Sequence, residues 1–362
     1  MQTNQISPKQ RIFASNTIRL KKNERIELLA ELGHFLSADP GEDLQQVMQR
    51  SYAENRWFTP ENIQKALRAI ATGFLDQKKL QTWAAQYAIA ANPHPSKTVG
   101  LVMAGNIPLV GFHDWLCVFV AGQRAKVKLS EKDKYLLPFL VNKLGEWHFE
   151  SREYTEFLSE MDKLIGIDAV IATGSNNTAR YFEQYFGKYA HIIRRNRNGI
   201  AVLSGRETSA ELHALGLDIF SYFGLGCRNV SKLYVPAGYD FDPLLEALHA
   251  YRDIIHHDKY KNNFDYNCTL FILNNIPFRN NGCLLLREDP SLQSRISSVH
   301  YAYYNRMEQL LDELNQNQAA IQCVVGNSTL PGWRVVPFGH AQEPGLADYP
   351  DGVDVMHFLT NL

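Results

Sequence analysis

The sequence has few cysteines and no long apolar run, and these absences exclude whole classes of protein. Five cysteines stand singly at positions 117, 227, 268, 283 and 323. An odd number of cysteines without a CxxC pair argues against a disulfide framework or a zinc ribbon, and we expect no metal site. No stretch reaches the ~20 apolar residues that span a bilayer. The N-terminal MQTNQISPKQRIF lacks the apolar core of a secretory signal. We therefore expect a reducing cytoplasm, where one thiol can carry chemistry.

The chain also lacks a charge of one sign. Thirty-seven basic residues face thirty-eight acidic ones, so nothing favours nucleic acid or a membrane surface as the partner. We see no internal repeat and no low-complexity tract. The 362 residues are 45% hydrophobic, which suffices for one large domain or two of medium size.

The first ~95 residues have a helical pattern. Asn23 is expected to cap a helix with apolar residues at 26, 29, 32 and 36, and a second helix is expected after Pro60. The segment 92–95, Asn-Pro-His-Pro, should end this region.

Strands then alternate with helices. The expected strands are 98–103, 125–129, 168–173 and 191–193, separated by helices over 109–121, 133–147 and 176–186. This alternation predicts a parallel sheet covered on both faces. A second α/β unit is expected from Gly199, with strands over 199–203, 232–235, 269–273, 282–286 and 321–325. The polar, basic stretch 194–199 is the expected domain boundary.

Two of the expected strands lead into turns that suit a ligand. In Ala104-Gly105-Asn106-Ile107-Pro108, the glycine permits close approach and the Asn106 amide is a donor at a strand's carboxyl end. In Thr173-Gly174-Ser175, a helix N-terminus follows and would suit a phosphate, although no GxGxxG pattern is present. Taken alone, each segment is better explained as an ordinary capped turn.

A third segment, Gly226-Cys227-Arg228, places a thiol between a glycine and a cation. Open access and the positive neighbour should make this thiolate more reactive than that of a free cysteine, whose pKa is ~8.5. The alternative is a buried structural cysteine, which we expect for the other four. His256 and His257 are adjacent, and adjacent side chains on a helix point in different directions, so the two do not predict a metal site. Either histidine is a candidate catalytic base.

The order of these segments resembles the aldehyde dehydrogenase superfamily. Residues 104–108 are similar to its asparagine-bearing turn, and Lys128-Leu129-Ser130-Glu131 to its Lys-Pro-Ser/Ala-Glu motif. Residues 172–175 with Thr178 are similar to Phe-Thr-Gly-Ser, and Gly226-Cys227 to the nucleophile segment. The AGNIP, GLGCRNVSKLYVP and DYPDGVDVMHFLTNL stretches most resemble acyl-CoA reductases related to the reductase subunit of the bacterial bioluminescence fatty-acid reductase complex. The resemblance covers residues ~95–362.

The resemblance implies two α/β domains with the active site in the cleft between them. Residues 1–199 would form the helical N-terminal region and the cofactor domain, and residues 200–362 the catalytic domain. The implied activity is NAD(P)H-dependent reduction of an acyl-CoA, or an acyl group on a carrier protein or synthetase, to the aldehyde. The resemblance favours NADPH as the cofactor. NADH remains open, because Glu131 would repel a 2′-phosphate, whereas Lys132 or Lys134 could bind one. A homo-oligomer is left open.

The resemblance also implies roles for individual residues. Cys227 would carry the acyl group, with the Asn106 side chain and the Cys227 backbone N–H as oxyanion donors. The expected cofactor residues are Lys128, Ser130, Glu131, Gly174, Ser175 and Thr178, with Lys128 on a ribose hydroxyl, Gly174 and Ser175 under the pyrophosphate and Thr178 near the adenine.

The chain departs from the superfamily where its hydrolytic members carry a water-activating glutamate. The corresponding stretch reads Arg194-Arg195-Asn196-Arg197-Asn198-Gly199, which suits an enzyme that must not hydrolyse its acyl intermediate. Three alternatives remain at this stage: a cofactor-free cysteine acyltransferase or thioesterase using His256 or His257, an acyl-phosphate reductase, and a non-catalytic subunit that presents an acyl chain.

Overall fold

The computed structural model describes residues 20–90 and 97–362, and the break expected at 92–95 lies outside them. Four helices open the fold: α1 (Lys22–Ser37), α2 (Glu42–Glu54), α3 (Pro60–Phe74) and α4 (Gln77–Ala84). The Asn23 cap is wrong, because Asn23 lies inside α1 and Lys21 precedes it, donating its backbone N–H to the Glu24 carboxylate at 2.5 Å. In α3 the Thr59 hydroxyl caps the helix and Pro60 occupies its first position, two residue types that are favoured at a helix start.

A five-stranded parallel sheet follows, in the order β3-β2-β1-β4-β5. Its strands are β1 (Thr98–Val102), β2 (Arg124–Lys128), β3 (Thr155–Leu158), β4 (Ala169–Thr173) and β5 (Ala190–Arg194). The helices between them are α5 (Phe112–Ala121), α6 (Leu136–Trp147) and α7 (Asn176–Phe186). The four predicted strands of this half and its three predicted helices are confirmed, and only the short edge strand β3 was missed.

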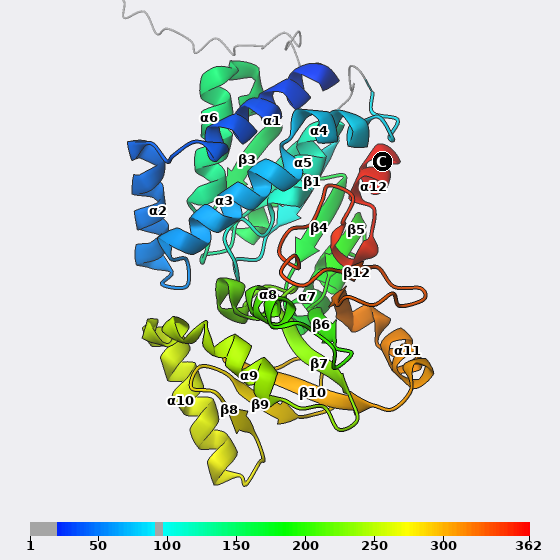
Figure 1. The fold of residues 1–362 in the computed structure, drawn as a ribbon. Coiled ribbons are helices and arrows are strands. Elements are labelled where there is room, and N and C mark those ends of the chain that lie inside the picture. The colour runs from blue at the N-terminus through cyan, green and yellow to red at the C-terminus, as the bar shows by residue number, and fades with distance from the viewer. Residues whose placement is uncertain (1–19, 91–96) are drawn as a thin grey trace, which may run out of the picture.

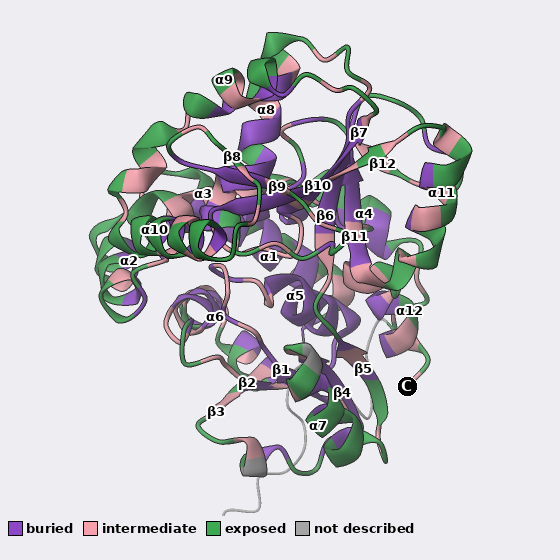
Figure 2. Cartoon of the chain, turned by 90° about the horizontal axis from the view of Figure 1, so that it is seen from below, coloured by how far each residue is buried: buried purple, intermediate pink, exposed green. Residues whose placement is uncertain are grey.

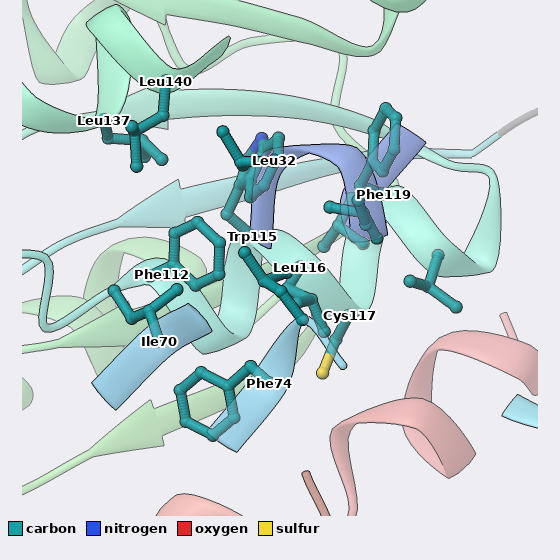
Figure 3. Packing of buried hydrophobic residues seen from close by; sticks show 14 of the residues in the cluster. Leu32, Ile70, Phe74, Phe112, Trp115, Leu116, Cys117, Phe119, Leu137 and Leu140 are labelled. Carbon is teal, nitrogen blue, oxygen red and sulfur yellow. The ribbon is translucent and has the colours of Figure 1, made fainter. Parts of the chain in front are cut away.

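Helix α5 is the centre of the larger core. All ten of its residues are buried, because the helix packs against the sheet on one side and against α1, α3 and the C-terminal helix on the others. Figure 3 shows Trp115 and Leu116 of α5 among side chains from α1, α3 and α6, including Leu32, Ile70 and Leu137. The N-terminal helices and the first sheet therefore share one core.

The second sheet has seven strands in the order β12-β11-β6-β7-β10-β9-β8. They are β6 (Asn198–Val202), β7 (Val230–Pro236), β8 (Arg279–Asn280), β9 (Leu285–Glu288), β10 (Ser298–Tyr304), β11 (Ile321–Val325) and β12 (Val335–Val336). All pair in parallel except β8 with β9. The helices here are α8 (Ser209–Phe220), α9 (Asp242–His249), α10 (Asp258–Leu273) and α11 (Met307–Gln316). In Figure 2 the central strands of this sheet are buried and α10 is largely exposed.

Two expectations for this half need correction. The segment 269–273 is the last turn of α10, not a strand. Phe264 and Phe271 are seven residues apart on one face of this helix, and both pack with Leu285 of the neighbouring strand. The strand predicted over 282–286 begins only at Leu285, and β10 was missed because its sequence, SVHYAYY, lacks a continuous apolar run.

The chain passes from the first sheet to the second between Arg194 and Asn198. Its last residues then return to the first half, where α12 (Val355–Thr360) packs on α5 and buries Val355, Met356 and Leu359. Figure 1 shows this tail running from β12 back to α4. In residues 20–90 and 97–362, no helix combines the length and apolarity needed to cross a membrane.

Candidate active site

The predicted ligand-binding turns lie at the carboxyl ends of three neighbouring strands. Lys128 ends β2, Gly105 follows β1, and Gly174 follows β4. Strand order reverses between β1 and β4, the point at which open α/β sheets bind ligands in the crevice beyond their strands. A Cβ atom on Gly105 would lie 2.6 Å from the Ser130 hydroxyl oxygen, so only glycine allows the two turns to lie this close.

The side chains at this sheet edge already have local partners. The Lys128 ammonium donates to the Leu129 carbonyl at 2.8 Å and contacts the Glu131 carboxylate at 3.2 Å. The Ser175 hydroxyl caps α7 by accepting the Thr178 N–H at 3.2 Å, and it lies 2.8 Å from the Thr178 hydroxyl. Helix α7 begins directly beyond the carboxyl end of β4, so its N-terminus lies at this sheet edge, an arrangement that suits a phosphate.

Asn106 and the cysteine segment, 119 residues apart in sequence at their contact, meet directly. The Asn106 side-chain amide donates to the Leu225 carbonyl at 2.7 Å. This bond joins the turn after β1, in the first half of the molecule, to the loop before Cys227, in the second half. One hydrogen of that amide is used in this contact, and the second remains available to a ligand.

The loop before Cys227 has an unusual backbone. Tyr222 and Phe223 have φ values of 52° and 59°, a region that side chains rarely adopt, and Gly224 continues at 76°. Asn229 secures this loop: its amide donates to the Asp218 and Ser221 carbonyls at 2.9 Å each, and its oxygen accepts the Gly226 N–H at 2.7 Å. Sequence reasoning missed Asn229, because its partners are defined only by the folded loop.

The Cys227 thiol is half-buried, and its pKa is raised. Burial is the main cause, and the nearby Asp351 carboxylate adds to it, while the Arg228 and Arg194 guanidinium groups act in the opposite direction. The sequence predicted that open access and a positive neighbour would make this thiol more reactive. The raised pKa contradicts that prediction. The cation is present, as predicted, but desolvation of the thiolate is the larger effect.

Arg194, from the stretch that the sequence marked as unusual, is part of this environment. It ends β5 and forms a buried bidentate ion pair with Asp114 of α5, with N–O distances of 2.8 and 2.9 Å. The carboxylate that influences Cys227 is Asp351, which lies 3.8 Å from Arg197 and whose pKa is raised by burial.

Cys227 lies on the wall between two cavities. One, of about 190 Å³, is lined by polar groups that include Arg197, Asn229 and Arg295. The other, of about 140 Å³, is lined mainly by apolar groups from α3, the turn after Asn106 and the C-terminal segment, with Ile70 and Pro108 among them. A reacting group at this thiol could therefore be approached from a polar side and from an apolar side.

A buried aspartate that the sequence did not reveal shapes the turn after Asn106. Leu109 has φ 57°, and its backbone N–H donates to the Asp133 carboxylate at 2.7 Å. The other oxygen of Asp133 is buried and has no partner within the described part of the chain. Burial raises the pKa of Asp133 to about 7. Its only sequence signal was its place two residues after the Lys128–Glu131 motif.

Neither candidate histidine is placed as a base for Cys227. The His256 side chain is 80% exposed and lies 3.8 Å from Asp253. His257 has both ring nitrogens engaged, one with the Arg56 carbonyl at 2.9 Å and one accepting the Tyr260 N–H at 3.3 Å. Among residues 20–90 and 97–362, no three His, Cys, Asp or Glu side chains gather as metal ligands would.

The remaining cysteines differ in their surroundings. Cys117, Cys283 and Cys323 are buried, as predicted. Cys268 is half-buried on α10, so its predicted place in a buried strand is wrong.

Solved structures with this arrangement of elements are aldehyde dehydrogenases. Aldehyde dehydrogenase 21 from Physcomitrella patens superposes with a TM-score of 0.63 at 12% identity, covering 94% of this chain and 84% of that one. An NAD-dependent aldehyde dehydrogenase from Sinorhizobium meliloti gives 0.62 at 12% identity, covering 88% and 72%. The indole-3-acetaldehyde dehydrogenase of P. syringae, solved with NAD+, gives 0.58 at 13% identity, covering 82% and 70%.

These similarities show the fold alone, which is that of the aldehyde dehydrogenases. No protein-family model matches the sequence, and no curated protein matches it. The predicted fold class, α/β and aldehyde-dehydrogenase-like, is therefore confirmed by structure.

Proposed function

We propose that this protein reduces an acyl thioester to an aldehyde with NAD(P)H, through an acyl group carried on Cys227. The observation that carries the proposal is the 2.7 Å bond from Asn106 to Leu225. It brings the one amide predicted to stabilise an oxyanion to the loop of the one cysteine predicted to be a nucleophile.

The sheet edge of the first half fits a nicotinamide cofactor. Gly105 keeps the crevice at the strand-order reversal open, and the N-terminus of α7 offers backbone donors to a pyrophosphate. We propose that Lys128 and Ser130 bind a ribose, with Gly174, Ser175 and Thr178 on the other side of the crevice. Bound there, the cofactor would supply the hydride that reduces the acyl carbon.

Cys227 and Asn106 perform the chemistry of the acyl group. The Cys227 thiolate attacks the thioester carbonyl, and the bond to the carrier sulfur breaks, so that the carrier leaves as a thiolate and takes up a proton. The second hydrogen of the Asn106 amide and the Cys227 backbone N–H stabilise the negative oxygen in each tetrahedral stage. After reduction, the carbon–sulfur bond to Cys227 breaks and the aldehyde is released.

The charges around Cys227 suit an acyl group that is reduced and not hydrolysed. Arg194 is a cation held by Asp114 and cannot accept a proton from water. Asp351 is the carboxylate that influences the thiol, and it lies near Arg197. We infer that Arg194, in the stretch where hydrolytic members of the superfamily carry a water-activating glutamate, favours reduction over hydrolysis.

The choice between the two cofactors is proposed to favour NADPH. Lys134 pairs with Glu54 at 3.4 Å, and Lys128 pairs with Glu131 at 3.2 Å. Lys132 remains as the cation that would meet a 2′-phosphate. We therefore expect NADPH to be used better than NADH, and Lys132→Glu to reverse the order.

Two other functions use the same cysteine. An acyl phosphate would acylate Cys227 equally well, and only the leaving group would differ. A cofactor-free acyltransferase would need a base beside the thiol, and His256 and His257 are not placed for it.

The test is oxidation of NADPH or NADH, followed by its absorbance, with a panel of acyl-CoAs and with an acyl phosphate. We expect oxidation that requires an acyl-CoA and is lost in Cys227→Ala. Release of CoA without oxidation of either cofactor would contradict the proposal and support an acyltransferase.

A further inference from the structure

A wide groove lies beside the apolar cavity that reaches Cys227. Helices α3 and α4 form one side of it and residues 342–347 the other, and its volume is about 970 Å³. The groove and the cavity share Ala69, Gln342 and Pro344 in their walls. The groove therefore adjoins the cavity that Cys227 lines, and the two together form the candidate path to the nucleophile. The size of the groove is that of a site for a large cofactor.

The groove carries more positive than negative side chains. Its charged wall residues are Lys65, Arg68, Lys78, Lys79, Glu61 and Glu343. Within the part of the chain that the structure describes, no ion pair joins any of the four cations, whereas other surface lysines such as Lys143 are paired. Glu343 is bound to His340 at 2.8 Å. Four cations against two acids leave a site suited to a multiply charged anion.

Lys65 links this groove to the nucleophile loop. Its side chain is half-buried, its ammonium donates to the Ser221 hydroxyl at 2.5 Å, and it lies 5.8 Å from the centre of the Tyr222 ring. Tyr222 lines the apolar cavity together with Cys227. Lys65 therefore lies at the inner end of the groove, next to the loop that carries the thiol.

Gln342 supplies a polar group at the narrow part of the path. Its side-chain nitrogen is buried and has no hydrogen-bond partner among the described residues. Gln342 lies beside the nucleophile segment, since a Cβ atom on Gly226 would be 3.5 Å from its oxygen. A hydrocarbon chain would leave this donor unsatisfied, whereas an amide-containing arm would accept its hydrogen bond.

We propose that the groove binds the phosphorylated end of coenzyme A, with Gln342 bonding an amide of its pantetheine arm, so that the thioester reaches Cys227 from this side. This inference rests on the proposed function and assigns its donor. Coenzyme A carries a diphosphate and a further phosphate, which matches several cations, and its arm contains amides. The single phosphodiester of a carrier protein's arm would not need four cations.

Direct binding of coenzyme A, measured by calorimetry without cofactor or turnover, tests the site. We expect Arg68→Glu/Lys79→Glu to weaken binding at least about tenfold, since two cations that would form charge-assisted hydrogen bonds to phosphate are lost. The control Arg252→Glu/Lys259→Glu makes the same charge change on exposed residues of the second half and should bind as wild type does. Equal weakening by both pairs, or coenzyme A binding that survives in the groove variant, would overturn the proposal.

A second measurement compares acyl-CoA with the matching acyl-pantetheine, which lacks the phosphates. Wild type should have a higher kcat/KM with the CoA ester than with the acyl-pantetheine. The groove variant should lose affinity for the CoA ester alone. Gln342→Leu should lose affinity for both esters. An unchanged preference in the groove variant would contradict the site while leaving the reductase intact. Binding of coenzyme A in the groove without any NAD(P)H oxidation would support the site and sink the proposed function.

Discussion

At Cys227, burial and positive charge act on the thiol in opposite directions. Burial dominates and raises its pKa, while Arg228 and Arg194 limit the rise. We expect alkylation by iodoacetamide to increase with pH through a midpoint above the ~8.5 of a free cysteine. Arg228→Met should move the midpoint higher still, since a cation that stabilises the thiolate is lost. The measurement belongs in a Cys268→Ser background, because Cys268 is the other thiol that is not buried. A midpoint below that of free cysteine would contradict this account.

Asn106 is the second residue with a defined chemical role. Removing one oxyanion donor costs about 10²–10³-fold in rate, so Asn106→Ala should lower kcat by about that factor. His256→Ala is the matched control and should stay within about twofold, since its side chain is 80% exposed. Steady-state kinetics on both variants, with melting temperatures to confirm folding, decides the point. A comparable loss in the histidine variant would favour an acyltransferase.

Asp133 makes stability depend on pH in a direction opposite to that of most aspartates. Burial raises its folded pKa from 3.8 to about 7, so the folded chain holds a proton that the unfolded chain has released. Its contribution to stability therefore falls as pH rises between about 4 and about 7. Asp133→Asn keeps an acceptor for the Leu109 N–H and should flatten this slope. Denaturant unfolding of both proteins across that range measures it, and parallel slopes would refute the assignment.

At the residue scale, the sequence revealed the reactive groups better than their supports. Cys227 and Asn106 stood out because glycines and a strand end surround them. Asp133, Asn229 and Gln342 did not, because each acts on residues that only the fold brings near: Asp133 on Leu109, Asn229 on the carbonyls of residues 218 and 221. A polar side chain in sequence carries no mark of a buried backbone partner.

Strand β5 and helix α5 are joined by a buried ion pair that holds the first sheet against its central helix. Asp114→Asn should destabilise the protein by about 3–5 kcal/mol, because it leaves the Arg194 charge buried without its partner. Glu183→Gln breaks the exposed pair with Arg195 and should cost about 1 kcal/mol or less. Urea unfolding of both variants compares the two. Equal effects would mean that the Asp114–Arg194 pair is solvated in solution.

Strands were predictable where a short apolar or alternating run is followed by a turn. Strands β1, β2 and β4 are short apolar or alternating runs that end at glycine or lysine turns. The TLFIL run of α10 was assigned to a strand because five apolar and β-branched residues read alike in either structure. Only the packing of Phe264 and Phe271 on β9 distinguishes them, and that contact is not local.

For the whole molecule, the C-terminal tail is the feature that sequence could not place. It belongs to the second half by position and packs in the first, where the Gln123 amide donates to the Leu359 carbonyl at 2.6 Å and Met356 is fully buried. Periodicity predicts elements, but the return of a distant segment depends on tertiary contacts.

The tail should contribute strongly to stability. Met356→Ala should cost about 2–5 kcal/mol, the range for a large side chain removed from a core. His357→Ala, on the exposed side of α12, should cost about 0.5 kcal/mol or less. Guanidinium unfolding measures both, and a negligible effect of the methionine change would show that α12 is not docked in solution.

The central claim is that Cys227 carries the acyl group, and intact-protein mass spectrometry tests it most directly. Incubation with an acyl-CoA in the absence of cofactor should add the mass of one acyl group, located on the peptide that contains Cys227. Addition of NADPH should remove that mass and release one aldehyde. An unmodified protein, a label on another residue, or an acyl group that leaves as the free acid when NADPH is added would contradict the account.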